Sequence, residues 1–205
     1  MNWNHSLPYF SRTAKSSTTV RAFFTTAIIF LALAGAHAQQ HYRLDPAKSE
    51  VHFTLDATGH AVEGTFKVGS GDVTFNTADG TMGGIISVDA TSGNSENKSR
   101  DKKMTADQLK AGQFPLVTFA PGKYSGTLNT SGDSSIQVEG AFTLLGQAHS
   151  ITVPMSVHCT GGQCAANGSF TVPFVQWGVK DPSVMFLKVA KEVKIELKLN
   201  GTIGQ

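Results

Sequence analysis

Apolar and polar residues alternate over most of this chain, a pattern that leaves β-strands as the main element it can form. The alternation is clearest near the C-terminus, where Val193, Ile195, Leu197 and Leu199 are separated by charged residues. Successive side chains of a strand point to opposite faces, so this period of two predicts strands with one buried and one wet face. The same pattern predicts strands within 51–55, 62–68, 72–75, 84–90, 116–120, 135–145, 150–159 and 165–174.

Glycine-rich turns such as Thr160-Gly161-Gly162 separate these segments, and the chain contains 21 glycines. Many short antiparallel strands are typical of a sandwich or an up-and-down barrel. Only residues 104–112 have a helical pattern. We expect Thr105 to cap the start of this helix, Leu109 to supply its apolar contact and Gly112 to end it.

Residues 1–38 have the organisation of a secretory signal peptide. A basic leader without acidic residues precedes the apolar run Ala22–Gly35, and Ala36-His37-Ala38 supplies small residues for cleavage. We therefore expect an exported domain, residues 39–205, in the periplasm or outside the cell, with no stable membrane span after cleavage. An uncleaved anchor is the alternative, but this run is shorter than the roughly 20 residues that a spanning helix needs.

Charge and length limit the function of that domain. Without the leader, 14 Lys and Arg face 15 Asp and Glu, a net charge of −1. A nucleic-acid-binding domain normally has a basic surplus, so we expect no nucleic-acid partner. About 167 residues are enough for one domain with a substantial core.

Cys159 and Cys164 flank a predicted turn and would face each other across a β-hairpin. Residues opposed in this way are close enough for a disulfide, which export would favour. A redox-active or metal-binding pair is the alternative, although its usual spacing is Cys-x-x-Cys.

Catalytic motifs are absent from the sequence: it contains no nucleophile elbow, phosphate loop or dinucleotide fingerprint. The histidines of residues 39–205 form no HxH or HExxH pair. We therefore predict a protein that is not an enzyme and has no cofactor or metal. A metal site or enzyme that uses His52, His60 or His149 from separate strands is one alternative.

Several ordered segments resemble the YceI-like family. They are Tyr42-Arg43-Leu44-Asp45, Ser49-x-Val51-x-Phe53, Gly64-Thr65-Phe66, Arg100-Asp101, Phe114-Pro115-x-Val117-Thr118-Phe119 and Val138-x-Gly140-x-Phe142-Thr143-Leu144-x-Gly146, followed by Trp177-Gly178-Val179 and the final apolar strand. The resemblance covers nearly all of residues 39–205. It implies an exported bacterial protein with an extended, lipocalin-like antiparallel barrel of about eight strands.

The family resemblance also implies a ligand, namely a polyisoprenoid chain such as a quinone tail or a prenyl phosphate, or another long apolar lipid. Burying each methylene of such a chain would contribute about 0.8 kcal/mol. A homodimer is left open. Alternation or family position turns one set of aromatic residues inward, and these are the expected lining of the lumen: Phe53, Phe66, Phe75, Phe119, Phe142, Phe170 and Trp177.

The long connection that contains Ser99–Phe119 has two interpretations. In the first it is a plug, in which Leu109 and Phe114 cover an open end of the barrel while Arg100 and Asp101 pair to anchor the crossing. In the second it is a site at the rim, where a head group meets basic side chains, because a guanidinium fork suits phosphate. The basic candidates are Arg100, Lys102 and Lys103.

A different class of function competes with lipid binding. The domain would then be a ligand-free structural or interaction module of the periplasm that meets another protein through exposed loops such as 92–104. Retention of lipid after purification separates the two hypotheses.

Overall fold

We describe a computed structural model of the chain, in which residues 39–204 are placed. The predicted signal peptide, residues 1–38, lies outside the described residues and stays a prediction. The elements in chain order are β1 (Gln40–Leu44), η1 (Pro46–Lys48), β2 (Glu50–Leu55), β3 (Val62–Phe75), β4 (Met82–Asp89), η2 (Ala90–Ser92), α1 (Lys98–Lys103), η3 (Met104–Gln108), β5 (Leu116–Thr127), β6 (Gly132–Leu144), β7 (Gln147–Thr160), β8 (Gln163–Val172) and β9 (Val193–Gly204).

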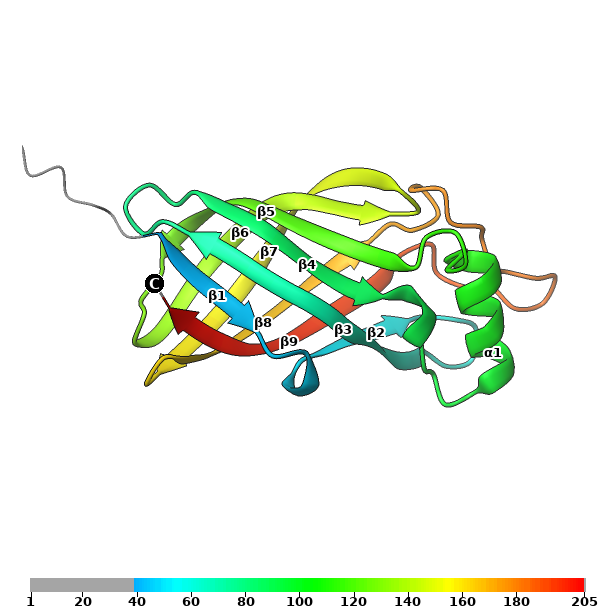
Figure 1. Cartoon of the computed structure of the whole chain (residues 1–205). Helices are drawn as coiled ribbons and strands as arrows, with labels where there is room; N and C mark the ends of the chain where they lie inside the picture. Colours follow the sequence, from blue (N-terminus) through cyan, green and yellow to red (C-terminus); the bar gives the residue numbers. More distant parts are fainter. Residues whose placement is uncertain (1–38, 205) are drawn as a thin grey trace, which may run out of the picture. The chain divides into compact units, whose positions relative to one another are not determined.

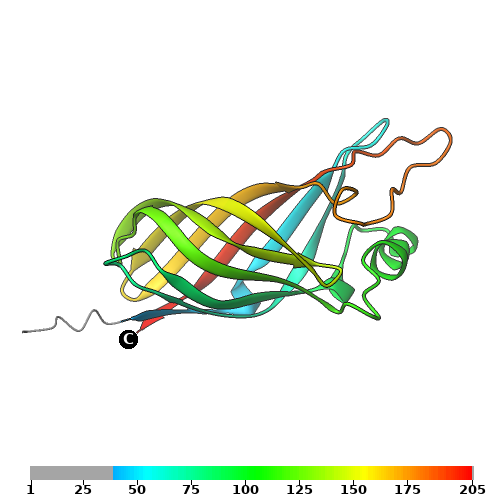
Figure 2. The same ribbon diagram turned by 90° about the horizontal axis from the view of Figure 1, so that it is seen from above.

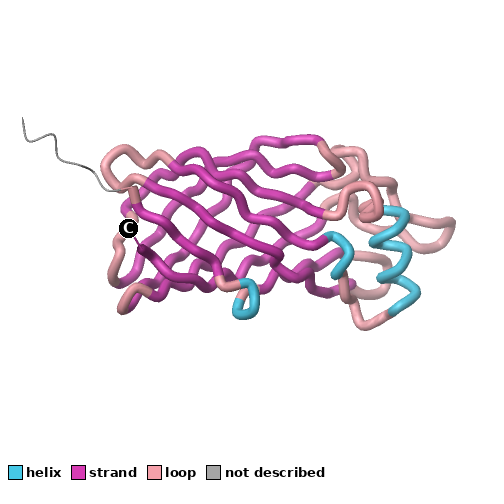
Figure 3. Tube along the Cα trace, viewed as in Figure 1, coloured by secondary structure: helices cyan, strands magenta, loops and turns pink. Residues whose placement is uncertain are grey.

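The strands form one closed antiparallel barrel (Figures 1 and 3). Neighbours from β3 to β9 are joined in sequence order, and β2 closes the ring between β9 and β3. The pair Phe53–Ile195 joins β2 to β9, and the pair Phe53–Gly64 joins β2 to β3. The predicted all-β, lipocalin-like barrel is therefore confirmed.

Nine strands fill only eight positions, because β1 and β2 share one. Both pair with β3 on one side and with β9 on the other. The turn η1 interrupts this shared position at Pro46, whose nitrogen cannot donate to a ladder. Ser49 bridges the break: its hydroxyl donates to the Asp45 carbonyl at 2.8 Å and accepts from the Asn200 amide at 2.9 Å.

The two ends of the barrel differ. One end, which we call the closed end, has the short connections 76–81, 128–131 and 161–162, together with the start of β1 and the end of β9. The opposite end, which we call the open end, has the loops 56–61, 90–115, 145–146 and 173–192. Figure 2 shows α1 and the loop 173–192 at this open end, beyond the strands.

The helical segment lies in the predicted connection, but it begins earlier than expected. Asn97 caps α1 by accepting the Arg100 amide at 3.1 Å. The Thr105 hydroxyl instead donates to the Asp101 carbonyl, so Thr105 is inside the helical segment and the predicted cap was wrong. A wider π-type turn follows, in which the Leu109 amide donates to the Met104 carbonyl. Lys110, at φ 48°, ends the segment before Gly112 is reached, so the predicted stop was also wrong.

Candidate functional site

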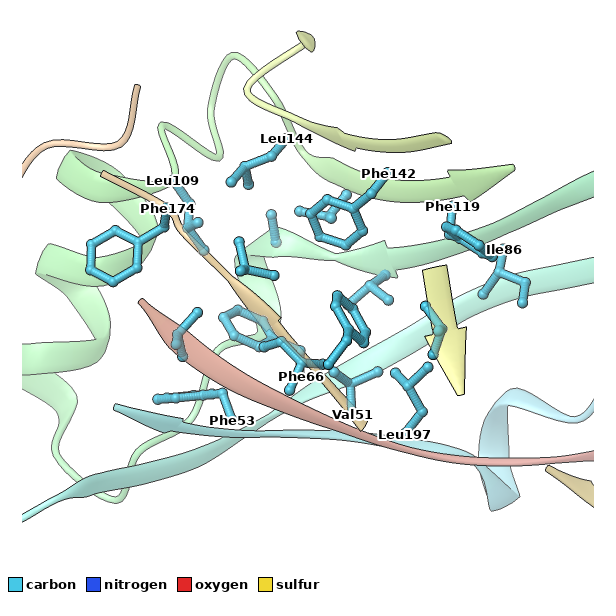
Figure 4. A pocket seen from close by; sticks show the side chains of 18 of the residues that line it. Val51, Phe53, Phe66, Ile86, Leu109, Phe119, Phe142, Leu144, Phe174 and Leu197 are labelled. Carbon is cyan, nitrogen blue, oxygen red and sulfur yellow. The ribbon is translucent and has the colours of Figure 1, made fainter. Parts of the chain in front are cut away.

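The barrel encloses an elongated cavity of about 820 Å³. Volumes of this order are typical of small-molecule sites. Its walls are the inward residues of the strands, for example Val51 and Phe53 of β2 with Ile195, Leu197 and Leu199 of β9. Figure 4 shows apolar side chains from several strands pointing into the same space. Alternation along each strand therefore produces an apolar lumen.

Six of the seven predicted aromatic residues lie on this wall: Phe53, Phe66, Phe75, Phe119, Phe142 and Phe170. Their rings also pack on one another. The ring centroids of Phe53 and Phe66 are 5.5 Å apart, and those of Phe142 and Phe170 are 5.7 Å apart in an edge-on arrangement. Such pairs add about 0.5–1.5 kcal/mol beyond the area they bury.

Two glycines make room for these rings. A Cβ atom on Gly64 would lie 2.6 Å from the Phe53 ring, and one on Gly140 would lie 2.6 Å from the Phe119 ring. Each ring therefore covers a neighbouring strand where that strand has no side chain. Packing of these rings thus explains why glycine occupies positions 64 and 140 in the YceI-like segments.

Trp177 is not among the lining residues, contrary to the prediction. It lies in the loop 173–192 and stacks on His149, with ring centroids 4.1 Å apart and planes at 4°. Its centroid is 5.8 Å from that of Phe142, which itself faces the cavity. His149 is opposite Phe142 in the β6–β7 ladder, so the two side chains share one face of the sheet and Trp177 packs on the inward side of this pair, at the open end. Sequence reasoning could not find this stack, because Trp177 comes from the loop 173–192 and His149 from the distant strand β7.

Polar lining residues gather at the open end of the cavity. We call this set the mouth; it comprises His60, Ser95, Asn97, Ser99, Arg100, Lys103 and Gln108. Along most of its remaining length the cavity is lined by aliphatic and aromatic side chains. Only the mouth concentrates groups that could hydrogen-bond or pair with a polar end of a ligand.

Ser95 organises the mouth. It is 3% exposed, and its hydroxyl donates to the Asp101 carboxylate while accepting from Arg100 Nε at 2.7 Å. Asp101 also accepts the Ser95 amide at 2.8 Å, and Arg100 Nη2 donates to the Ser95 carbonyl. Among residues 39–204, Arg100 and Asp101 form no ion pair with each other. The predicted direct pairing is therefore corrected to a shared anchor on Ser95, which the sequence did not signal.

The segment after α1 covers part of the open end. Met104, Gln108 and Leu109 reach the cavity, and Figure 4 shows Leu109 pointing toward it. Phe114 does not line the cavity; its ring lies where a Cβ atom on Gly146 would be 2.9 Å away. The plug interpretation and the rim-site interpretation of this connection therefore each retain some support. Leu109 covers the open end, and Arg100 and Lys103 lie in the mouth.

Lys102 and Lys103 differ in position. Both are exposed, but only Lys103 is among the lining residues. Within the described part of the chain, the Gln108 side-chain oxygen is buried without a hydrogen-bond partner. Buried acceptors are normally satisfied, so this oxygen is available to a donor on a ligand.

Tyr42 and the cysteine pair lie at the closed end. Cys159 and Cys164 are opposite each other in the β7–β8 hairpin and form a disulfide, with Cα atoms 4.1 Å apart. The Tyr42 hydroxyl donates to the Cys164 carbonyl at 3.5 Å, and burial raises the pKa of this phenol. Both Tyr42 and Cys164 face the cavity. The cysteines are therefore structural here, as expected.

The histidines are dispersed. His52 contacts Glu50 at 2.7 Å, His60 is at the mouth and His149 stacks on Trp177. Across residues 39–204, no three His, Cys, Asp or Glu side chains gather in a group that could hold a metal. Neither does any helix in this part of the chain reach the length and hydropathy of a membrane span.

The chain is similar to known proteins in sequence and in fold. The sequence model of the family described as "YceI-like domain" matches residues 42–201. A search of curated proteins finds no match. Among solved structures, Burkholderia cenocepacia BcnA is 24% identical with a TM-score of 0.64, and the match covers 78% of this chain and 99% of that one.

Two further solved structures are similar at lower identity. A polyisoprenoid-binding domain from Saccharophagus degradans, described as implicated in plant cell wall breakdown, is 14% identical with a TM-score of 0.62, over 78% of this chain and 98% of that one. A Campylobacter jejuni YceI protein is 16% identical with a TM-score of 0.57, over 70% of this chain and 86% of that one. At these identities the likeness concerns the fold.

Proposed function

Because this chain belongs to the YceI-like domain family, we propose that it is an exported, non-catalytic protein that holds a polyisoprenoid chain in its barrel. The observation that carries this proposal is the elongated apolar cavity with its polar groups collected at one end. A similar fold is described as a polyisoprenoid-binding domain. The cargo would be a quinone tail, a prenyl phosphate or another long apolar lipid.

The chemistry of the wall supports an apolar chain as ligand. Aliphatic and aromatic residues can bury the methylenes of a ligand, and each buried methylene contributes about 0.8 kcal/mol to binding. These residues offer few hydrogen bonds, so the wall does not favour a ligand with many polar groups. The polar end of the lipid would then lie at the mouth, where Lys103 attracts negative charge and the Gln108 side-chain oxygen accepts from a hydroxyl, as on a reduced quinone or a protonated phosphate. Arg100 serves chiefly to hold the connection, since Ser95 occupies its Nε and Nη2.

The first experiment is native mass spectrometry of the protein isolated from an exporting host, followed by organic extraction and mass analysis of the released material. We expect one long-chain isoprenoid or other lipid per protein. A clean mass without added ligand, and no binding of quinones or prenyl phosphates, would contradict the proposal and favour the periplasmic interaction module.

A matched pair of variants links any bound lipid to the cavity. Ala166 of β8 lines the cavity, whereas its neighbour Asn167 is exposed on the opposite face of the strand. Ala166→Trp should fill the lumen and lower lipid content by about tenfold, because several methylenes would lose their place. Asn167→Trp adds the same side chain outside and should leave lipid content unchanged. Equal loss in both variants would mean that the lipid is bound elsewhere.

A further inference from the structure

The loop 173–192 ends in an exposed apolar turn, Val184–Leu187, which we call the apolar tip. Met185 is 80% exposed, Phe186 is 88% exposed and Val184 is 62% exposed. The Val184 amide donates to the Leu187 carbonyl at 2.9 Å, and the Leu187 amide returns the bond at 3.1 Å. These bonds make a tight reversal that turns Met185 and Phe186 outward. Contiguous exposed apolar residues of this kind mark an interaction site.

The base of the apolar tip is fixed to the barrel. The Thr58 amide donates to the Lys188 carbonyl at 2.8 Å, and the Lys188 amide donates to the Thr58 hydroxyl at 3.1 Å. Ala57 and Val189 form an antiparallel bridge, and the Ala190 amide donates to the Asp56 carbonyl at 2.8 Å. The loop therefore holds Met185 and Phe186 in a defined place beyond the strand ends, as Figure 2 shows for the loop as a whole.

The apolar tip is continuous with the mouth. Val184 and Leu187 line the cavity, while Met185 and Phe186 between them do not. An apolar ligand that leaves the cavity beside Val184 and Leu187 would therefore meet the tip before it met bulk water. A surface that covers the tip would also lie across the opening.

Charge favours an anionic partner at this end. The four loops of the open end carry eight Lys and Arg against six Asp and Glu, a net charge of +2. The remaining described residues carry six against nine, a net charge of −3. Beside the tip, Lys180, Lys188 and Lys191 are exposed, with Asp181 and Glu192 as the acidic residues of the same loop. Basic residues around an apolar anchor are typical of proteins that bind the surface of anionic membranes.

We propose that the apolar tip docks on an anionic lipid bilayer, with Met185 and Phe186 in the interface and Lys180, Lys188 and Lys191 against the head groups. Such docking would place the mouth at the membrane surface, where an apolar chain could pass between bilayer and cavity without crossing water. That passage rests on the proposed function, whereas docking itself rests on the apolar tip and its lysines alone.

Vesicle flotation tests the docking. Protein isolated from an exporting host is mixed with vesicles of phosphatidylglycerol and phosphatidylcholine in equal parts. We expect the wild type to float with the vesicles and Met185→Ser/Phe186→Ser to bind about tenfold less, since two apolar side chains lose their burial. Ile85→Ser is the matched control, because Ile85 is an apolar β4 residue, 49% exposed and absent from the cavity lining. This control should bind like the wild type.

A second set of measurements separates charge from apolar contact. Replacing Lys180, Lys188 and Lys191 with glutamine should remove the preference for phosphatidylglycerol vesicles over pure phosphatidylcholine, and added salt should do the same to the wild type. Unchanged binding of either the serine or the glutamine variant, or no binding by the wild type, would overturn the proposal. A third outcome would also overturn it. If sedimentation velocity shows a wild-type dimer that Met185→Ser/Phe186→Ser dissociates, and neither the wild type nor this variant binds vesicles, the tip contacts a second copy of the chain.

Lipid extraction from the same samples distinguishes this proposal from the preceding one. A serine variant that keeps its extracted lipid but fails to float has lost docking alone. A wild type that floats, carries no lipid as isolated and binds no added quinone or prenyl phosphate would refute lipid carriage and leave docking intact.

Discussion

At the scale of single residues, position in the mouth depends on which side of α1 a residue occupies. Lys102 and Lys103 are neighbours in sequence with the same charge, yet only Lys103 reaches the cavity lining. Arg100 also lies there, but its side chain is held by Ser95. Lys103 is therefore the residue of the three predicted cations that is best placed to meet a head group.

Lys103→Gln should weaken binding of a prenyl phosphate about fivefold, because an exposed charge pair contributes at most about 1 kcal/mol. Binding of the uncharged prenol of the same length should not change. Lys102→Gln is the matched control and should behave like the wild type with both ligands. Equal weakening of phosphate and prenol by Lys103→Gln would show that this lysine acts through structure and not through charge. Affinities can be measured by competition with a fluorescent lipid.

At the scale of elements, the β7–β8 hairpin strengthens the closed end. Its disulfide joins Cys159 and Cys164, which are 0% and 4% exposed. The carbonyl oxygen of Cys164 accepts a hydrogen bond from the hydroxyl of Tyr42 in β1. The hairpin thus connects the first strand to the pair β7 and β8, while the open end has long loops instead.

The double variant Cys159→Ala/Cys164→Ala should lower the free energy of unfolding by about 2 kcal/mol, as chain entropy predicts for so short a loop. Alanine keeps these buried positions apolar and so avoids an unpaired hydroxyl. Urea denaturation monitored by circular dichroism would measure the change. Cys164 lines the cavity only at its closed end and alanine keeps that position apolar, so extracted lipid should stay close to the wild-type amount. A loss of stability below about 0.5 kcal/mol would show that packing alone holds this end.

At the scale of the whole molecule, one cavity connects all eight positions of the barrel. Buried residues from β1 to β9 form a cluster that includes Leu44, Val51, Phe75, Val138 and Leu199. Each of these except Leu44 also faces the cavity. A ligand in the lumen would therefore contact most of the sheet at once.

Loading should consequently stabilise the barrel as a unit. With free ligand at a hundred times its dissociation constant, the gain is about 2.7 kcal/mol. Thermal unfolding of delipidated and reloaded protein would show this gain as a higher Tm, and hydrogen exchange should slow in all strands. Ala166→Trp should show neither effect. A Tm that does not respond to any lipid would contradict a lumenal ligand, as would exchange that slows only in the loops.

Alternation in the sequence predicts most of the strands, their inward faces and the cysteine hairpin, but it misses β1 and divides β3 into two segments. These features depend on contacts between near neighbours in the chain, so alternation in segments such as 193–199 was enough to predict them. Alternation or family position predicted the six phenylalanines that line the cavity. The choice between sandwich and barrel required the resemblance to a family, because alternation is the same in both.

The arrangement of side chains at the ends of the barrel depends on tertiary contacts. Trp177 packs on His149 and does not line the cavity, because the loop 173–192 brings it against strand β7. Ser95 became the anchor of the mouth through contacts with α1, and Asn97 displaced the predicted cap. The apolar tip is exposed because residues 56–58 hold its base. Loops have no period that reports their surroundings, so contacts between distant segments fix where their side chains lie.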